Sequence, residues 1–335
     1  MQTQNQPNSE SASHERVLIT GGSGFIGTNL VTDCLKKGWE VCNLSADSPP
    51  DSSQNQYWTK VDLLDAKSIR ESFTKFSPTL VMHLGARTDL KGKSLEDYAA
   101  NIQGVHNVLD AVQETQPKRA IYASSRLVFR IDSKPKHDYD YSATTWYGKS
   151  KIKTEEIIKE RDGAGVPWTI VRPTSIWGPW FNVPYRTFFS TIEQGRYFHP
   201  RNHQILKSFG FVENVTYELL RLAAVEEAKV NKKVFFLADY EPLNVLEWAH
   251  EVQQELKAPP IKQLPYPVLK AGALVGDVLG MGGVNKFPLN SFRLNNLVCN
   301  MVYDLSNLQS VIGPLPYSRQ EGVKRTCEWI RKHPQ

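Results

Sequence analysis

The sequence of 335 residues predicts an α/β fold in which a doubly wound parallel sheet carries a smaller, discontinuous second domain. Three observations predict it: short β-branched runs alternate with helical segments, glycines join the first run to the first helix, and the alternation stops after Arg172. Parallel strands need long, usually helical crossover connections, so this alternation indicates one sheet with helices on both faces.

The first half contains six short apolar runs typical of buried strands. They lie near residues 16–20, 39–44, 57–61, 79–84, 119–124 and 168–172. Segments with helical spacing of apolar residues lie near residues 25–37, 66–75, 95–115 and 146–162. A Pro-, Trp- and Phe-rich segment follows, and a late apolar run at 234–237 is expected to return to the sheet.

A glycine-rich turn links the first expected strand to the first helix. Gly21, Gly24 and Gly27 form a GxxGxxG pattern, and the helix begins at Phe25. Glycines there permit a tight turn, let the backbone approach a pyrophosphate and allow close helix–strand packing, while free N–H groups at the helix start hold phosphates. The pattern predicts a Rossmann-type dinucleotide site, the alternative being a tight turn without a ligand.

This prediction divides the chain. Residues 1–14 are polar and are expected to form a disordered tail. The dinucleotide-binding domain is expected to comprise residues 15–173 and 207–239. The substrate-binding part is then left with residues 174–206 and 240–335, and the substrate is expected between the two, outside the carboxyl ends of the strands.

The end of the second strand bears on which dinucleotide binds. An acid there binds the adenosine ribose of NAD, whereas an Arg accommodates the 2′-phosphate of NADP. The strand ends at Leu44 and Ser45, followed by Ala46 and Asp47, so neither signal stands at the strand end. NAD and NADP both stay open, with NAD favoured because no positive charge is nearby. Asp62, after the third strand, is expected to contact adenine or to cap a turn.

Three residues predict acid–base chemistry. Tyr147 and Lys151 lie one helical turn apart on the same face of a predicted helix, and Ser125 follows a predicted strand about twenty residues earlier. A free phenol has a pKa of roughly 10, and a nearby ammonium is expected to lower it. With the dinucleotide turn, these residues predict a tyrosine base for hydride transfer at a carbinol carbon. The alternative is a surface Tyr and a solvated Lys.

These motifs, in this order, resemble those of an extended short-chain dehydrogenase/reductase of the NAD-dependent epimerase/dehydratase family. The resemblance runs from about residue 15 to the C-terminus. The matching segments are residues 21–27, Asp62, residues 83–86 and 101–104, Ser125, Tyr147, Lys151, and residues 172–179 and 303–329.

The resemblance implies an NAD(P)-dependent epimerase, dehydrogenase or reductase that acts on a nucleotide sugar and forms a homodimer. It implies catalytic roles for Ser125, Tyr147 and Lys151. The cofactor contacts that it implies are Gly21, Gly24, Phe25, Ile26, Gly27, Ser45, Asp62, Leu63, Leu84, Ala86, Tyr147 and Lys151. The substrate contacts are Ser175, Trp177, Lys207 and Arg293. Trp177 and the neighbouring aromatic residues either stack on a base or sugar ring or form the core of the small domain.

Two departures from the family pattern bear on function. Arg126 and Leu127 follow Ser125 where the family's 4,6-dehydratases carry an acidic pair, so that activity is not expected. Ser175 stands where an asparagine often touches the substrate diphosphate. This leaves open a dehydrogenase or reductase of a steroid-like or small carbonyl substrate. A non-catalytic dinucleotide sensor is a further alternative, which the retained Tyr147 and Lys151 disfavour.

Composition agrees with a soluble globular enzyme. The formal net charge of +5 is too small to indicate nucleic-acid binding. The four cysteines have no metal or redox spacing, and no secretory signal is visible, so the expected location is the cytoplasm.

Two further patterns have plain interpretations. His199 and His203 have a metal-ligand spacing, but an intervening proline indicates a loop, and no metal is expected. Residues 264–284 are apolar but are interrupted by Lys270, Asp277, glycines and prolines. They are expected to form a packed helix, or a surface for a partner or a membrane face, and not a membrane span.

Overall fold

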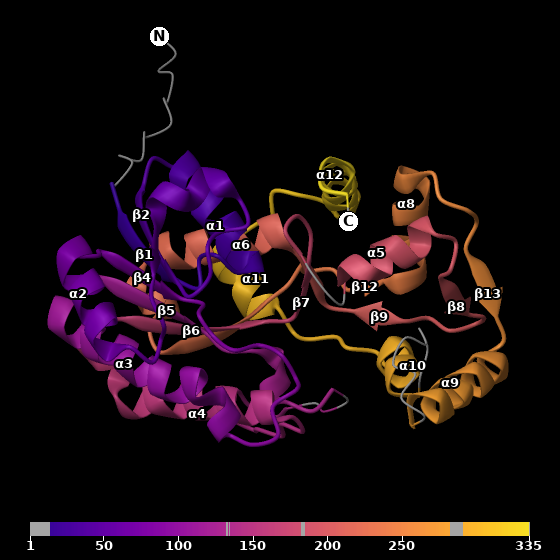
Figure 1. Cartoon of the computed structure of the whole chain (residues 1–335), viewed down its shortest axis with the longest axis horizontal. Coiled ribbons are helices and arrows are strands. Elements are labelled where there is room, and N and C mark those ends of the chain that lie inside the picture. Colours follow the sequence, from indigo (N-terminus) through magenta and orange to yellow (C-terminus); the bar gives the residue numbers. More distant parts are fainter. Residues whose placement is uncertain (1–13, 132, 134, 182–184, 282–290, 335) are drawn as a thin grey trace, which may run out of the picture.

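Seven parallel strands form the central sheet of the protein, whose computed structural model describes residues 14–131, 133, 135–181, 185–281 and 291–334. Their order is β11-β6-β5-β4-β1-β2-β3 (Figure 1). The strands are β1 (Arg16–Thr20), β2 (Glu40–Ser45), β3 (Trp58–Lys60), β4 (Leu80–His83), β5 (Arg119–Ala123), β6 (Trp168–Pro173) and β11 (Lys233–Leu237). The predicted fold class, with its late strand, is confirmed.

Helices cover both faces of this sheet. One face carries α1 (Phe25–Lys36) and α6 (Val212–Ala224), which contact each other. The other carries α2 (Ala66–Phe76), α3 (Ala99–Thr115) and α4 (Trp146–Glu160), seen below the sheet in Figure 1. Side chains of a strand alternate between faces, so each face of the sheet has its own apolar core.

The chain reverses its direction of winding at β1, which pairs with β2 on one side and β4 on the other. From β1 the strand order runs outward to β3 on one side and to β6 and β11 on the other. In open sheets of this kind ligands bind outside the carboxyl ends of the strands at such a point. The topology therefore directs attention to the loops after β1, β2 and β4.

Short strand pairs and helices follow β6, and many of them form the part at the right of Figure 1. The paired strands are β7 (Ser175–Trp177) with β10 (Phe209–Phe211), β9 (Leu206–Lys207) with β12 (Leu243–Asn244), and β8 (Phe198–Pro200) with β13 (Lys262–Leu264). The helices are α5 (Tyr185–Glu193), α7 (Glu227–Val230), α8 (Val245–Leu256), α9 (Tyr266–Met281), α10 (Ser291–Val298), α11 (Ser306–Ile312) and α12 (Arg319–Lys332).

Candidate active site

The glycine turn after β1 is as tight as its sequence predicts. Gly21 has a φ of +74°, and a Cβ on it would lie 2.7 Å from Gly85 Cα. A Cβ on Gly27 would lie 2.2 Å from the Gly21 carbonyl oxygen. Gly24, the N-cap of α1, brings no side-chain hydrogen bond to the helix start. The first N–H groups of α1 therefore have no side-chain cap, an arrangement that fits a phosphate group.

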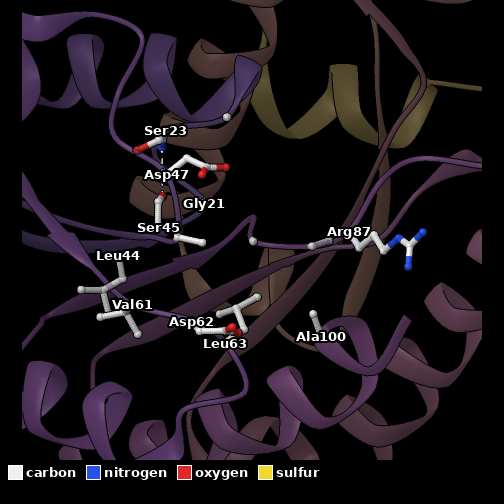
Figure 2. Close-up of a pocket in the computed structure, with 14 residues that line it drawn as sticks. Gly21, Ser23, Leu44, Ser45, Asp47, Val61, Asp62, Leu63, Arg87 and Ala100 are labelled. Carbon is white, nitrogen blue, oxygen red and sulfur yellow. Dashed lines mark hydrogen bonds between the residues drawn. The ribbon is translucent and has the colours of Figure 1, made fainter. Parts of the chain in front are cut away.

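A cavity of about 300 Å³ opens beside this turn, at the carboxyl ends of β1, β2 and β4 (Figure 2). Six of the expected cofactor contacts line it: Gly21, Gly24, Ser45, Asp62, Leu63 and Ala86. Its other lining residues were not named among the expected cofactor contacts: Ser23, Leu44, Ala46, Asp47, Val61, Gly85, Arg87 and Ala100. The glycine cradle and the cavity together fit a dinucleotide better than a ligand-free turn.

The remaining expected cofactor contacts lie outside this cavity lining. Phe25, Ile26 and Leu84 pack against the apolar core, and Gly27 touches the turn itself. Asp62 accepts a hydrogen bond from Leu64 N at 2.9 Å and also lines the cavity. Both expectations for Asp62, a turn residue and a ligand-facing carboxylate, are therefore compatible with its position.

Hydrogen bonds order the polar end of the cavity. Ser23 N donates to Ser45 Oγ at 3.1 Å, and Ser45 Oγ donates to Asn43 Oδ1 at 2.8 Å. Figure 2 shows Asp47 on this side, close to Ser23 and Ser45. No acid stands at the end of β2, but Asp47, two residues after the last residue of this strand, lies at the polar end of the cavity.

Arg87 brings a positive charge to the opposite end of the cavity (Figure 2). Its Nε donates to Asp89 Oδ2 at 2.7 Å, and its Nη1 donates to the Asp97 carbonyl at 2.7 Å. No cation directly follows the second strand in the sequence, and Arg87 is indeed contributed by the loop after β4. Its neutralisation by Asp89 leaves little charge for a 2′-phosphate.

Asn101 joins the cavity to α4. Its Oδ1 accepts from Arg87 N at 2.8 Å, and its Nδ2 donates to the Arg87 carbonyl and to Ser150 Oγ, at 3.0 and 2.9 Å. Ser150 Oγ in turn donates to the Tyr147 carbonyl at 2.7 Å. One buried amide therefore positions both the loop after β4 and the helix that carries Tyr147.

Ser125, Tyr147 and Lys151 lie together at the carboxyl end of β5, and all three are buried. Burial raises the pKa of Tyr147 to about 12, while a hydrogen bond with Ser125 acts in the opposite direction. The expected lowering of this pKa by Lys151 is therefore not met in this structure, because desolvation dominates.

Lys151 hydrogen-bonds the end of β5 and not the Tyr147 hydroxyl. Its Nζ donates to the Ala123 carbonyl at 2.7 Å. Burial lowers the pKa of Lys151 to about 8, and the Glu155 carboxylate opposes this shift. Lys151 therefore keeps its charge at neutral pH, although it has almost no exposed surface.

A buried network below these residues was not anticipated. Glu155 accepts from Arg172 Nε at 2.8 Å and Arg172 Nη2 at 2.6 Å, and neither side chain has exposed surface. Ser124 Oγ and Tyr141 OH complete the set of donors to Glu155. The four donors therefore surround a carboxyl group that lies one helical turn from Lys151.

Trp177 corrects one expectation. It has no exposed surface, and its ring lies 5.2 Å from the rings of both Phe211 and Trp248. A fully buried indole in an aromatic cluster has no face left for a base or sugar ring. Trp177 is thus a core residue of the second part, and its assignment to the substrate is wrong for this conformation.

The other expected substrate contacts differ in position. Ser175 forms a hydrogen bond with Tyr185. Lys207 is only 2% exposed, and its ammonium donates to the Asn296 carbonyl at 2.9 Å and to the Cys299 carbonyl. Burial lowers the pKa of Lys207 to about 8; Cys299 opposes this, and the charge of Arg126 adds to it. The side chain of Arg293 lies outside the described part of the structure.

Arg126 places a cation next to the predicted catalytic hydroxyl. It begins the short 3₁₀ turn Arg126–Val128, and Leu127 N donates to Ser125 Oγ at 3.2 Å. The Nη1 atom of Arg126 is buried without a hydrogen-bond partner among the described residues. A buried guanidinium nitrogen with no acceptor fits an anionic ligand that comes from outside the chain.

His199 and His203 both contact other atoms of the chain. His199 Nδ1 lies 3.0 Å from Tyr197 OH, and its Nε2 lies 3.4 Å from the His203 carbonyl. Across the residues that the structure describes, no three His, Cys, Asp or Glu side chains gather closely enough to hold an ion.

Comparisons with known proteins agree with this geometry. An N-acetyl-alpha-D-glucosaminyl-diphospho-ditrans,octacis-undecaprenol 4-epimerase of Escherichia coli O157:H7 is 26% identical over 96% of each chain. A 3beta-hydroxysteroid-dehydrogenase/decarboxylase of Arabidopsis thaliana is 26% identical over 93% of this chain and 78% of that protein. The UDP-glucose 4-epimerase of Thermus thermophilus, solved with NAD, has a TM-score of 0.69 at 20% identity, over 95% of this chain and 99% of that one.

A family model supplies the last comparison. The model described as "NAD dependent epimerase/dehydratase family" matches residues 17–195, which is more than half of the chain and includes every predicted catalytic residue. The glycine cradle, the cavity at the reversal of the sheet and the group formed by Ser125, Tyr147 and Lys151 all lie within it. The protein therefore belongs to the NAD-dependent epimerase/dehydratase family.

Proposed function

We propose that the protein interconverts a carbinol and a carbonyl on a sugar that is linked to a diphosphate, as an epimerase or a reductase of the nucleotide-sugar type. The observation that carries this proposal is the meeting of Ser125, Tyr147 and Lys151 in a buried group at the carboxyl end of β5. A dinucleotide sensor without chemistry would have no use for a buried phenol, hydroxyl and ammonium in one place.

Each residue has a defined role in the proposed reaction. Tyr147 takes the proton of the substrate hydroxyl as the carbinol C–H bond breaks, and returns it in the reverse direction. Ser125 hydrogen-bonds the same oxygen, and its hydrogen bond with Tyr147 favours the phenolate against the burial that raises the pKa of this phenol. Lys151, one helical turn away, supplies the positive charge of the group. A nicotinamide dinucleotide bound along the glycine cradle would supply the acceptor and donor of hydride.

Two cations support a diphosphate-linked substrate. The buried Nη1 of Arg126 lacks an acceptor among the described residues, and the charge of Arg126 acts on Lys207. A substrate oxyanion between them would satisfy the guanidinium nitrogen and relieve the like-charge repulsion. Both the Escherichia coli relative, by its name, and the family resemblance make a sugar diphosphate the first substrate class to test.

NAD is the proposed dinucleotide. Asp47 lies at the polar end of the cavity near Ser45, where a 2′-phosphate would meet a carboxylate. Arg87 is paired with Asp89 and lies at the other end. A carboxylate favours ribose hydroxyls as donors and disfavours a phosphate, so this charge distribution supports NAD over NADP.

The test begins with the mass and absorbance of the dinucleotide that copurifies with the full chain. Nucleotide sugars and polyprenyl-diphosphate sugars are then added, with a 3β-hydroxysteroid as the competing substrate class suggested by the Arabidopsis relative. Transient reduction of NAD that returns without net NADH would identify an epimerase, and stoichiometric consumption of the dinucleotide would identify a reductase or dehydrogenase. Turnover of the steroid alone would overturn the sugar-diphosphate proposal.

Tyr147→Phe is the variant that tests the base. We expect kcat to fall by about 10²–10⁴-fold with dinucleotide affinity unchanged, because only the proton acceptor is lost. Tyr139→Phe is the matched control, since Tyr139 is partly exposed in the loop before α4. Equal activity of Tyr147→Phe and the control would refute the assignment of Tyr147 as base.

Three earlier expectations stay predictions: the homodimer, the cytoplasmic location and the division of the chain into residues 15–173 with 207–239 and residues 174–206 with 240–335. In the described residues no helix is both long and apolar enough to cross a membrane.

A further inference from the structure

Helix α9 is apolar on two opposite sides. Leu269 and Ala273 are buried against Leu294 of α10. The opposite side exposes Val268, Leu274, Val275, Val278 and Leu279, which are between 36% and 68% exposed. These five residues, called here the α9 face, are nearly half of the large apolar side chains exposed in the described structure. A helix that is hydrophobic all round is normally covered all round, so the α9 face requires an occupant.

The α9 face is a continuous stripe. At 100° per residue its five members span an arc of roughly 140°, centred opposite the buried pair Leu269 and Ala273. Lys270 and Asp277 lie two turns apart on the same border of the stripe; Lys270 is exposed, and Asp277 accepts from Ser291 N at 3.2 Å. The stripe therefore has the width of a helix that lies in a membrane interface, and any excess of positive charge beside it must come from neighbouring elements.

The elements around α9 are basic. Arg201 N donates to the Leu264 carbonyl at 2.8 Å, and the His203 ring lies 5.1 Å from that of Tyr266, so the loop after β8 adjoins the start of α9. Residues 196–207 and 257–281 together contain five exposed Lys or Arg, besides the buried Lys207, and one acid, Asp277. Exposed cations at the border of an apolar stripe attract anionic lipid headgroups, at about 1 kcal/mol for each Lys or Arg near the surface.

We propose that the α9 face docks the protein on the surface of an anionic lipid bilayer, with the helix lying in the interface. The charge balance favours this occupant over a second copy of the chain, because an isologous contact would bring the exposed Arg201, Lys262 and Lys270 of two copies together. With 16 residues, α9 lies on the bilayer and does not cross it.

Docking would place the bilayer near the proposed substrate site. Helix α10, which packs on α9, supplies the Asn296 carbonyl that accepts from Lys207, and the Cys299 carbonyl directly after it accepts from the same side chain. A sugar diphosphate carried on a lipid could therefore reach Lys207 without leaving the membrane surface. This last step rests on the proposed function, whereas the docking itself does not.

The test is co-sedimentation of the full chain with vesicles of phosphatidylcholine alone and of equal parts phosphatidylcholine and phosphatidylglycerol. The test variant is a double variant with Val275→Asp and Val278→Asp. The matched control is Leu90→Asp, because Leu90 is comparably exposed and lies far from α9 in the sequence. We expect the protein and the control to bind the anionic vesicles and the double variant to bind roughly tenfold more weakly, with binding falling at high salt.

Several results would overturn the proposal: absence of binding to anionic vesicles, equal binding of the double variant and the control, or a dimer in sedimentation velocity that only the double variant abolishes. Val275→Ser is a milder second variant, and unchanged thermal unfolding and dinucleotide affinity show that the fold is intact. Vesicle binding by a protein that fails to turn over any sugar diphosphate would uphold the docking while removing the proposed function.

Discussion

The buried ion pair between Arg172 and Glu155 makes a quantitative prediction. Arg172→Met removes two of the four donors to Glu155 and leaves its carboxylate buried with only Ser124 and Tyr141. A hydrogen bond to a charged group contributes about 1.5–3 kcal/mol, so two give about 3–6 kcal/mol. Removing one partner of a buried pair costs about 3–5 kcal/mol in general. We therefore expect the free energy of unfolding to fall by about 4 kcal/mol.

Urea unfolding of the full chain, followed by fluorescence and circular dichroism, measures this change. Arg161→Met is the matched control, because Arg161 pairs with Asp110 at 2.7 Å but both side chains are partly exposed. The control should lose no more than about 1 kcal/mol. The double variant Glu155→Met with Arg172→Met should recover much of the loss, since no buried charge remains. If Arg172→Met and Arg161→Met lose the same stability, the reasoning is wrong.

Three further predictions concern the cavity and its surroundings. Gly27→Ala should weaken dinucleotide binding roughly tenfold or more, because its Cβ would lie 2.2 Å from the Gly21 carbonyl. Gly38→Ala is the control in a fluorescence titration: its Cβ meets nothing within 4 Å, and its φ of +73° should lower stability while dinucleotide affinity stays unchanged. Burial and Lys151 lower the pKa of His83 to about 3, so its neutral form is favoured in the fold. Stability should therefore decline as pH falls from about 6.5 toward 3, by about 2 kcal/mol at pH 5, and His83→Gln should remove that part of the slope in urea titrations. Asp47→Asn should reduce the preference for NAD over NADP, measured as the ratio of the two dissociation constants, by about tenfold, because the doubly charged 2′-phosphate of NADP, about 5 Å from the side chain, would no longer meet about 1.7 kcal/mol of repulsion from the carboxylate. An unchanged ratio would contradict the role of Asp47.

The sheet could be predicted from the sequence because its signals are local. Each strand is a short apolar run, each crossover has helical spacing, and the handedness and order of such units follow general rules. Even the late strand at 234–237 was predictable, because it is an isolated β-rich run after the alternation has ended. The small strand pairs of the second part were not, since two- and three-residue strands such as β9 and β7 leave no periodicity.

The site was predictable where function depends on the backbone, as at Gly21 and Gly27. It was less so where packing decides. An indole such as Trp177 has the same local pattern whether it faces a ligand or a core, and only the positions of distant aromatic residues separate the two. The contact of Lys151 with the Ala123 carbonyl, and the four donors to Glu155, likewise join segments far apart in sequence.

The edge strand β11 has a consequence for how the chain is made. It completes the sheet beside β6 only after roughly sixty intervening residues, which include β7 to β10. At about 5–20 residues per second, a ribosome needs about 3–12 s to supply it, and during that time β6 presents unpaired N–H and C=O groups. The nascent protein is therefore most exposed to aggregation in the interval between synthesis of Pro173 and of Leu237. Synonymous codons that slow translation there should lower the yield of soluble protein without changing a single residue.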